Sequence, residues 1–251
     1  MNNLFIRDDK FDWRNDSRKV SLANQLLNKA GIPARLRPLY ATGFMTNLEQ
    51  RMNLYHLVSQ VLAYGVTGDL AEAGTYVGST AVLMQLIIDG EGQGQTLHVY
   101  DSFEKSWGAD DPLKELKANF DRYCGKRPAI HEGRFDQTMP SELPDAIAFI
   151  NIDCGWGGPT HRNIARGYDD SLHHHDAILR HILEHIYPRL SPGAVCSLID
   201  YWHPSLHDGL HNPNPAVQPT VDELLANKPE TISVLYAGDN LQAYFRKSGG
   251  R

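Results

Sequence analysis

The chain has 251 residues, of which 41% are hydrophobic and 22% charged, so it has the composition of an ordinary globular protein of the size of one large α/β domain with an elaboration. Its formal net charge of −6 argues against a nucleic-acid partner, and no apolar run approaches the roughly 20 residues that span a bilayer. The 3 cysteines are odd in number and widely spaced, which argues against a disulfide framework or a cysteine zinc site.

The N-terminal part of the chain, residues 1–65, is predicted to form a helical elaboration of the domain formed by residues 66–251. Apolar residues recur at helical spacing within 17–64, and Thr46 or Asn47 is placed to cap a helix that ends at Gly65. The first residues lack the basic-then-apolar order of a secretory signal, so we expect a cytoplasmic protein.

From residue 69 onward, short apolar runs alternate with helical stretches. The predicted strands are 69–74, 97–102, 129–133, 146–153, 194–200, 231–236 and 241–247. The first five belong to strand–helix units, while the last two are separated by only four residues. This order predicts an α/β fold with a doubly wound sheet of seven strands, mostly parallel with one antiparallel strand.

Four chemically suggestive residues follow these strands directly. They are Gly74, Asp101, Asp153 and Asp200. In doubly wound sheets the ligand lies outside the carboxyl ends of the strands, where the winding reverses. We therefore expect the functional site at this edge.

The turn from Gly74 to Gly78 lets the backbone approach a ligand closely, and Ser79 opens the following helix. A carboxylate at Asp101 can accept the two hydroxyls of a ribose, and Glu72 can accept an ammonium group. A carboxylate site, a ribose acceptor and an ammonium acceptor together describe S-adenosylmethionine. The alternative is that Gly74 and Gly78 only form a tight turn between strand and helix and that Ser79 only caps the helix.

The segments "GDLAEAGTYVGSTAVLM", "VYDSFEKSW", "HEGRFDQTMP", "IYPRLSPGAVCSLIDY" and "TVDELL" resemble, in this order, the macrocin O-methyltransferase family, which methylates sugar hydroxyls of antibiotics. The resemblance implies a class I methyltransferase fold with a Rossmann-like sheet and S-adenosylmethionine as cofactor. It also implies a divalent cation, usually Mg²⁺, a homo-oligomer, and a small-molecule acceptor such as a glycosylated natural product.

The resemblance also implies roles for individual residues in cofactor binding. Glu72, Gly74 and Ser79 would hold the methionine moiety, together with Thr75 and Tyr76 of the same turn. Asp101 would hold the ribose. Near the adenine the resemblance places three residues, Ser102, Gly133 and Phe135.

Asp153 and Asp200 follow the fourth and fifth strands and are candidate metal ligands. Neighbouring strands lie about 4.8 Å apart, so two carboxylates leaving adjacent strand ends can share one hard cation, and Mg²⁺ suits two carboxylates plus waters. A metal-bound hydroxyl is more acidic and so a better nucleophile. The alternative is that each aspartate merely caps the turn that follows it.

The sequence departs from the family at two places. Ile199 precedes Asp200 where an acidic pair commonly follows the fifth strand, and Gly155 and Trp156 stand where a base is expected. His203 is a candidate third metal ligand, or else an ordinary loop histidine. The histidine-rich insertion 155–176 offers a replacement base, and His161, which follows Asp153 soonest, is our candidate beside Asp153 itself.

The sequence thus predicts an S-adenosylmethionine-dependent O-methyltransferase that uses a divalent cation and has neither a nucleic acid nor a membrane as partner. A metal-independent enzyme with a histidine base and a non-catalytic module for an adenosyl ligand stay open as alternatives. A dinucleotide-dependent oxidoreductase is disfavoured, because the glycines Gly74 and Gly78 do not have the G-x-G-x-x-G spacing.

Overall fold

A computed structural model describes residues 22, 25–27, 29–31, 46–104, 109–154, 172–207, 210, 212–238 and 240–249. Its centre is a seven-stranded sheet in the order β3-β2-β1-β4-β5-β7-β6. The strands are β1 (Asp69–Ala73), β2 (Leu97–Asp101), β3 (Ala129–Glu132), β4 (Ile147–Ile152), β5 (Leu190–Ile199), β6 (Ser233–Leu235) and β7 (Gln242–Arg246).

The predicted topology is confirmed. Strands β1 to β5 pair in parallel, and β7 lies antiparallel between β5 and β6. Strand β5 begins earlier than the sequence suggested, because Pro192 and Gly193 read as a turn but lie within it. An irregularity in its pairing with β4, between Ile147 and Phe149, absorbs the extra residues.

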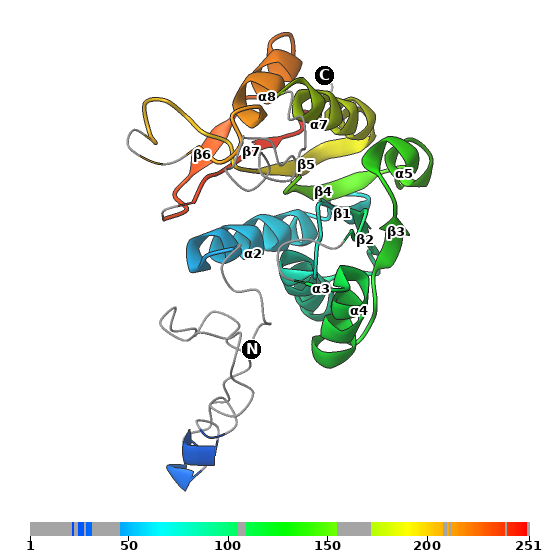
Figure 1. The fold of residues 1–251 in the computed structure, drawn as a ribbon, viewed down its shortest axis with the longest axis vertical. Coiled ribbons are helices and arrows are strands. Elements are labelled where there is room, and N and C mark those ends of the chain that lie inside the picture. Colours follow the sequence, from blue (N-terminus) through cyan, green and yellow to red (C-terminus); the bar gives the residue numbers. More distant parts are fainter. Residues whose placement is uncertain are drawn as a thin grey trace.

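Helices cover both faces of the sheet (Figure 1). On one face lie α2 (Leu48–Ala63), α3 (Ser79–Glu91) and α4 (Pro112–Tyr123). On the other face lie α5 (Phe135–Glu142), α7 (Leu172–Ile186) and α8 (Val217–Leu225), and the short 3₁₀ helix η2 (Tyr187–Arg189) leads into β5. Each face has its own apolar core cluster, so the sheet is buried on both sides, as a mostly parallel sheet requires.

Helix α2 begins at a capping box. The Asn47 side chain accepts from the backbone N–H of Gln50, whose side chain in turn accepts from the backbone N–H of Asn47. The helix ends before Gly65, whose φ of 62° suits the left-handed conformation. Both limits match the prediction. Asn53 of this helix donates to the carbonyl of Tyr236 (2.9 Å), which ties α2 to the β6–β7 hairpin.

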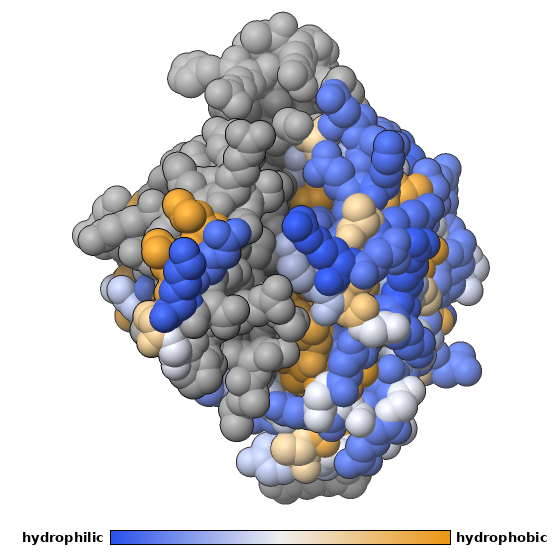
Figure 2. Space-filling view, turned by 90° about the horizontal axis from the view of Figure 1, so that it is seen from below, coloured by the Kyte–Doolittle hydropathy of each residue, from blue (hydrophilic) through white to orange (hydrophobic). Residues whose placement is uncertain are grey.

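The described surface seen from below in Figure 2 is mostly hydrophilic, with apolar side chains in small separate patches. Such scattered exposure is normal for a globular surface. Among the described residues, no helix has the length and apolarity that crossing a membrane requires.

Candidate active site

The site is built from four neighbouring strands, β2, β1, β4 and β5, whose carboxyl ends meet at one edge of the sheet. The chain winds outward from β1 in one direction and from β4 in the other, so the predicted switch point lies between these two strands. Glu72, Asp101, Asp153 and Asp200 stand at or just after the ends of the four strands. The structure therefore brings together the acidic residues that the sequence singled out.

Gly74 is required by the packing of β1 against the end of β4. Its φ is 87°, and a Cβ built there would lie 2.0 Å from the carbonyl oxygen of Asp153. The Asp153 N–H donates to the carbonyl of Ala73 (2.9 Å), which holds the two strand ends at this distance. The lack of space for a Cβ does not depend on a ligand, so Gly74 has a structural role whether or not it also lines a cofactor site.

The turn after β1 leads directly into α3. Gly78 is the N-cap residue and has a left-handed conformation. Because it has no side chain, the first backbone N–H groups of α3 point out of the helix without a hydrogen bond from a side-chain cap. Together with the helix dipole they favour an anion, such as a carboxylate, at this end. Ser79 is the first helical residue, and its hydroxyl lies 3.2 Å from that of Thr46, just before α2.

Glu72 is fully buried in β1 beneath this turn. Its Oε1 accepts hydrogen bonds from Thr80 and from the amide of Asn151 (3.0 Å), whereas its Oε2 has no hydrogen-bond partner. Burial raises the pKa of Glu72 to about 7; the polar side chains of Thr80, Asn151 and Thr75 oppose the rise, and the negative charge of Asp101 adds to it. A buried carboxylate oxygen without a partner is a ready acceptor for an ammonium group.

Asp101, the last residue of β2, organises the backbone around it. Its Oδ2 accepts from the N–H of Tyr76 (2.7 Å) and its Oδ1 from the N–H of Phe103 (2.8 Å). Both donors have a positive φ, 51° and 52°. Each oxygen retains a further lone-pair direction, so the carboxylate can still accept hydroxyls of a ribose.

Backbone strain concentrates at this edge. The described non-glycine residues with positive φ are Tyr76, Phe103 and Asp200, and each follows the end of β1, β2 or β5 within three residues. Such conformations cost about 1 to 3 kcal/mol each and persist where the surroundings impose them, which is common at ligand sites.

The residues predicted to lie near an adenine are adjacent to Asp101. Gly133 donates its N–H to the carbonyl of Asp101 (3.0 Å), and Ser102 follows Asp101 in a partly buried position. Phe135 begins α5 and packs against the core cluster under that helix. Contact of these residues with a cofactor stays a prediction.

Asp153 and Asp200 follow the ends of β4 and β5. The pKa of Asp153 is raised well above its ordinary value, first by burial and then by the negative charges of Asp200, Glu72 and Asp101. Burial raises the pKa of Asp200 to about 6. Asp200 has a φ of 63° and is fixed by its N–H, which donates to the carbonyl of Leu241 (3.1 Å).

His203 lies apart from this pair in the described contacts. Its N–H donates to Nδ1 of His207 (2.9 Å), and its own Nδ1 accepts from the N–H of Ser205 (3.3 Å), so Nε2 is the ring nitrogen left for a ligand. It lines a cavity beside α8 whose described lining includes neither Asp153 nor Asp200. No group of three His, Cys, Asp or Glu residues that could hold a metal ion occurs in the described part of the chain.

The predicted base and most of the histidine-rich insertion lie outside the described residues. This applies to Gly155, Trp156 and His161, and to the side chains of His173, His174 and His175 at the start of α7. Their roles stay predictions.

Comparison with known proteins places the chain among O-methyltransferases. The family model described as macrocin-O-methyltransferase matches residues 14–114. A rhamnosyl-tetracenomycin-C 4'-O-methyltransferase of Streptomyces olivaceus is 29% identical over 191 residues, which are 67% of this chain and 66% of that protein. Mycinamicin III 3''-O-methyltransferase of Micromonospora griseorubida is 26% identical over 192 residues, 66% of this chain and 68% of that protein.

The chain is similar to the macrocin O-methyltransferases over residues 14–114. The predicted resemblance and the predicted enzyme class, an O-methyltransferase, are confirmed. The match to the family model ends before β3, so Asp153 and Asp200 lie outside it. The part of the chain that departs from the family motifs is therefore also the part that the model leaves unmatched.

Solved structures confirm the class I methyltransferase fold. The O-methyltransferase NovP covers 90% of this chain and 88% of its own, with 18% identity and a TM-score of 0.60. CalS11, a TDP-rhamnose 3'-O-methyltransferase, covers 92% and 95% with 18% identity and a TM-score of 0.55. TomG of Streptomyces achromogenes, solved in complex with S-adenosylmethionine, covers 93% and 91% with 14% identity and a TM-score of 0.54.

One residue of the candidate site, Asn151, escaped the sequence reasoning. Asn151 and Thr80 both donate to the Glu72 carboxylate; Thr80 belongs to the segment that resembles the family, where a hydroxyl for a carboxylate ligand was expected, whereas Asn151 belongs to no recognised motif. A signal for Asn151 was present, because it is the one polar side chain within the apolar strand Ile147–Ile152. A buried polar residue in such a strand needs a hydrogen-bond partner, and here the partner is the candidate ammonium acceptor Glu72.

Proposed function

We propose that this protein transfers the methyl group of S-adenosylmethionine to a hydroxyl of a sugar attached to a small natural product. The observation that carries the proposal is the buried Glu72 carboxylate, with its unpartnered Oε2, beneath the uncapped start of α3 and beside Asp101. The comparisons support the sugar, because one curated relative is named for a rhamnosyl compound and the structural neighbour CalS11 for TDP-rhamnose.

The residues present fit the cofactor. Glu72 Oε2 accepts the ammonium group of the methionine moiety, and the backbone N–H groups at the start of α3, with Ser79, hold its carboxylate. Asp101 accepts the ribose hydroxyls, and Ser102, Gly133 and Phe135 border the adenine. S-adenosylmethionine supplies an electrophilic methyl group on a sulfonium, and the protein contributes by holding the acceptor oxygen in line with it.

Asp153 and Asp200 act on the acceptor. Their mutual repulsion, which contributes to the raised pKa of Asp153, fits a shared divalent cation, because a cation between them would remove it. Such a cation, Mg²⁺ in the first instance, would lower the proton affinity of the acceptor hydroxyl. The two carboxylates supply fewer protein ligands than a closed metal site has, which is usual for Mg²⁺, since it retains waters.

A metal-independent mechanism is the second candidate, and the raised pKa of Asp153 favours it. A carboxylate whose proton affinity is raised by burial and by neighbouring acids is a stronger general base. Asp153 would then take the proton of the acceptor hydroxyl itself, or His161 would do so.

Calorimetric titration with S-adenosylmethionine, with Mg²⁺ and again after exhaustive chelation, tests the cofactor site first. Binding under both conditions supports the proposal, and absence of binding in both overturns it. Transfer of a radiolabelled methyl group to an aryl rhamnoside then distinguishes the two mechanisms. Loss of transfer on chelation that Mg²⁺ restores supports the cation, and undiminished transfer supports the base.

Asp153→Asn is the decisive variant for the acceptor side. We expect transfer to fall at least about a hundredfold, because both mechanisms need this carboxylate, while cofactor affinity changes little. Asp145→Asn, at the opposite end of β4 and exposed, is the matched control and should retain full activity. Full activity of the Asp153 variant would remove this residue from the mechanism. Light scattering tests the further proposal of a homo-oligomer.

A further inference from the structure

Three buried polar atoms without a hydrogen-bond partner belong to Glu72 and to two residues that interact with it. They are Oε2 of Glu72, Oδ1 of Asn151 and Oγ1 of Thr75. The three residues are 0%, 1% and 3% exposed, so solvent does not satisfy these atoms. Buried polar atoms of this kind are rare in folded proteins, because each one costs free energy unless a binding partner satisfies it. Their concentration around one carboxylate points to a ligand group that binds there.

Asn151 is held beside Glu72 by the pairing of β4 with β1. The two residues are in register, so their side chains leave the same face of the sheet from neighbouring strands. The Asn151 Nδ2 group donates to Oε1 of Glu72 (3.0 Å). This bond fixes the orientation of the amide, because an amide turned over would point its oxygen at a carboxylate oxygen. Oδ1 of Asn151 is therefore left as an acceptor close to the carboxylate.

Thr75 approaches the same carboxylate from the turn after β1. Its side chain opposes the rise in the pKa of Glu72, as a hydroxyl that faces the carboxylate does. Its Oγ1 nevertheless has no hydrogen-bond partner. A hydroxyl oxygen has two lone pairs, so Thr75 can accept a hydrogen bond from a ligand.

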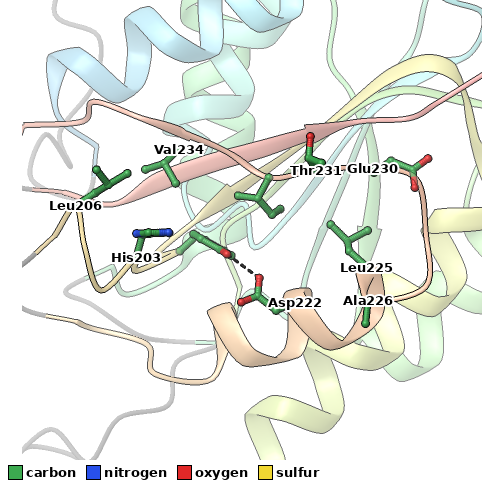
Figure 3. A pocket seen from close by; sticks show the side chains of 10 residues that line it. His203, Leu206, Asp222, Leu225, Ala226, Glu230, Thr231 and Val234 are labelled. Atoms are coloured by element: carbon green, nitrogen blue, oxygen red, sulfur yellow. Dashed lines mark hydrogen bonds between the residues drawn. The ribbon is translucent and has the colours of Figure 1, made fainter.

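The carboxylates of the cavity beside α8 provide a contrast (Figure 3). Asp222 accepts from the Tyr201 hydroxyl (2.6 Å), the bond drawn dashed in the figure. Glu230 is paired with Lys247, whose Nζ lies 3.6 Å from Oε1. In the part of the chain that the structure describes, neither carboxylate has a buried oxygen without a partner. Glu72 differs from both in this respect.

The ligand group that fits three acceptors has several N–H donors and no acceptor of its own. A primary ammonium group has three donors and no lone pair, and its charge balances that of a carboxylate. We propose that Oδ1 of Asn151 and Oγ1 of Thr75, together with Oε2 of Glu72, bind the primary ammonium group of the cofactor and make the site specific for it. The inference rests on the proposed function and deepens it, because it adds Asn151 to the cofactor-binding residues and gives Thr75 a definite partner.

Two ligands test the proposal by calorimetry on the full chain. They are S-adenosylhomocysteine and its deaminated analogue, in which a hydrogen replaces the ammonium group and the carboxylate is kept. Neither has a methyl group to transfer, so no turnover occurs. We expect the wild type to bind S-adenosylhomocysteine at least about a hundredfold more tightly, because the analogue lacks the donors for all three acceptors. Equal affinities for the two ligands would overturn the proposal.

Asn151→Leu and Thr75→Val each replace a buried side chain that has an unpartnered atom by an apolar one of similar shape, so both should fold. Each should weaken S-adenosylhomocysteine at least about fivefold and leave the analogue within about twofold of its wild-type affinity. Thr220→Val is the matched control, the same exchange at a threonine of α8 that is also 3% exposed, and should change neither affinity. Losses of equal size for both ligands would overturn the proposal, because structural damage does not distinguish them.

Titrations at pH 7 and pH 8 separate direct contact from an effect transmitted through Glu72. Asn151→Leu also removes the hydrogen bond from Nδ2, which raises the proton affinity of the Glu72 carboxylate. The negative charges of Asp101 and Asp153, which face this carboxylate, act in the same direction. A fivefold loss at both pH values supports direct contact. A loss that falls below about twofold at pH 8 would overturn the assignment of Asn151, because it would reflect only protonation of Glu72.

These outcomes separate the ammonium site from the proposed reaction. Selective losses in both variants, without methyl transfer from S-adenosylmethionine to a rhamnoside by the wild type, would leave the ammonium site assigned and refute the reaction. Methyl transfer by the wild type, with variants that keep the full preference for S-adenosylhomocysteine over its analogue, would refute the roles of Asn151 and Thr75 and leave the reaction standing. Absence of binding of S-adenosylhomocysteine to the wild type would overturn both.

Discussion

Replacing the Glu72 carboxylate by an amide should change the stability of the protein with a sign that depends on pH. The carboxylate is fully buried, and its pKa is raised from 4.5 to about 7, first of all by burial. The native fold therefore holds the proton more tightly than the unfolded chain does. Glu72→Gln keeps an oxygen for Thr80 and Asn151 but removes the titration.

The sign follows from proton linkage. Below pH 4.5 the carboxyl is protonated in both states and contributes no pH dependence; between 4.5 and about 7 the unfolded chain loses the proton and the native fold retains it. Stability of the wild type therefore falls as pH rises, and the full penalty is present above about pH 7. A rise of about 2.5 in pKa corresponds to about 3 kcal/mol at about 1.36 kcal/mol for each pKa unit.

The variant has a cost of its own, because its amide N–H₂ occupies the place of the unpartnered Oε2. An unsatisfied buried donor costs on the order of 1 kcal/mol or more. Without cofactor, Glu72→Gln should therefore be about 2 kcal/mol more stable than the wild type at pH 8 and about 1 kcal/mol less stable below pH 5. The substitution also removes the repulsion between the charges of Glu72 and Asp153, which further stabilises the variant relative to the wild type at high pH.

Urea denaturation of the cofactor-free protein at pH 4.5, 6, 7 and 8 measures the difference. Glu132→Gln, an exposed glutamate at the end of β3, is the control and should differ from the wild type by less than about 0.5 kcal/mol throughout. A difference between Glu72→Gln and wild type that is the same at every pH would refute the reasoning, because the buried carboxylate would then not be titrating in the folded state.

The affinity for S-adenosylmethionine should be bell-shaped in pH, falling below about 7 as Glu72 takes up a proton and above about 8 as the cofactor's α-amino group loses its own. Calorimetric titration checks this, and Glu72→Gln should abolish the acid limb; an acid limb that survives would assign it to another group. Gly74→Ala should cost at least about 3 kcal/mol, because its Cβ would meet the Asp153 carbonyl at 2.0 Å, whereas Gly65→Ala, also at positive φ but with open space around it, should cost about 1 kcal/mol. If thermal unfolding showed that the two variants lose the same stability, the close approach of β1 and β4 would not be the reason why position 74 requires glycine.

Much of the fold could be predicted from the sequence, because periodicity and topology rules act locally. Strands 69–73 and 147–152 are short apolar runs bounded by turns, and the parallel order follows from their alternation with helices. The start of β5 could not be predicted, because Pro192 and Gly193 have the local character of a turn. Only the irregular pairing with β4 shows that the strand continues through them.

At the site, the sequence predicted the positions of the acids but not their environments. That Asp101 ends a strand is visible in the sequence, whereas its two hydrogen bonds to Tyr76 and Phe103 depend on turns with positive φ that neither aromatic residue favours. Likewise, the cavity beside α8 joins residues 201–206 to 222–234. No spacing rule connects them, because α8 and the hairpin meet β5 only in the folded sheet.

The buried Glu72 carboxylate lowers the stability of the empty protein and at the same time strengthens the binding of a cationic group. A carboxylate buried to this extent destabilises the empty protein at neutral pH, and an apolar residue in β1 would avoid the penalty. The same desolvation makes Oε2 a stronger partner for a cationic group than a solvated carboxylate is, because the interaction takes place at low dielectric. An ammonium group bound next to Oε2 would lower the pKa of Glu72. Binding would thereby relieve the destabilisation caused by the buried charge, and this relief would contribute to the binding free energy. The cofactor should therefore stabilise this protein most between about pH 7 and 8, where the empty protein carries the penalty of the buried charge and the amino group of the cofactor is still protonated.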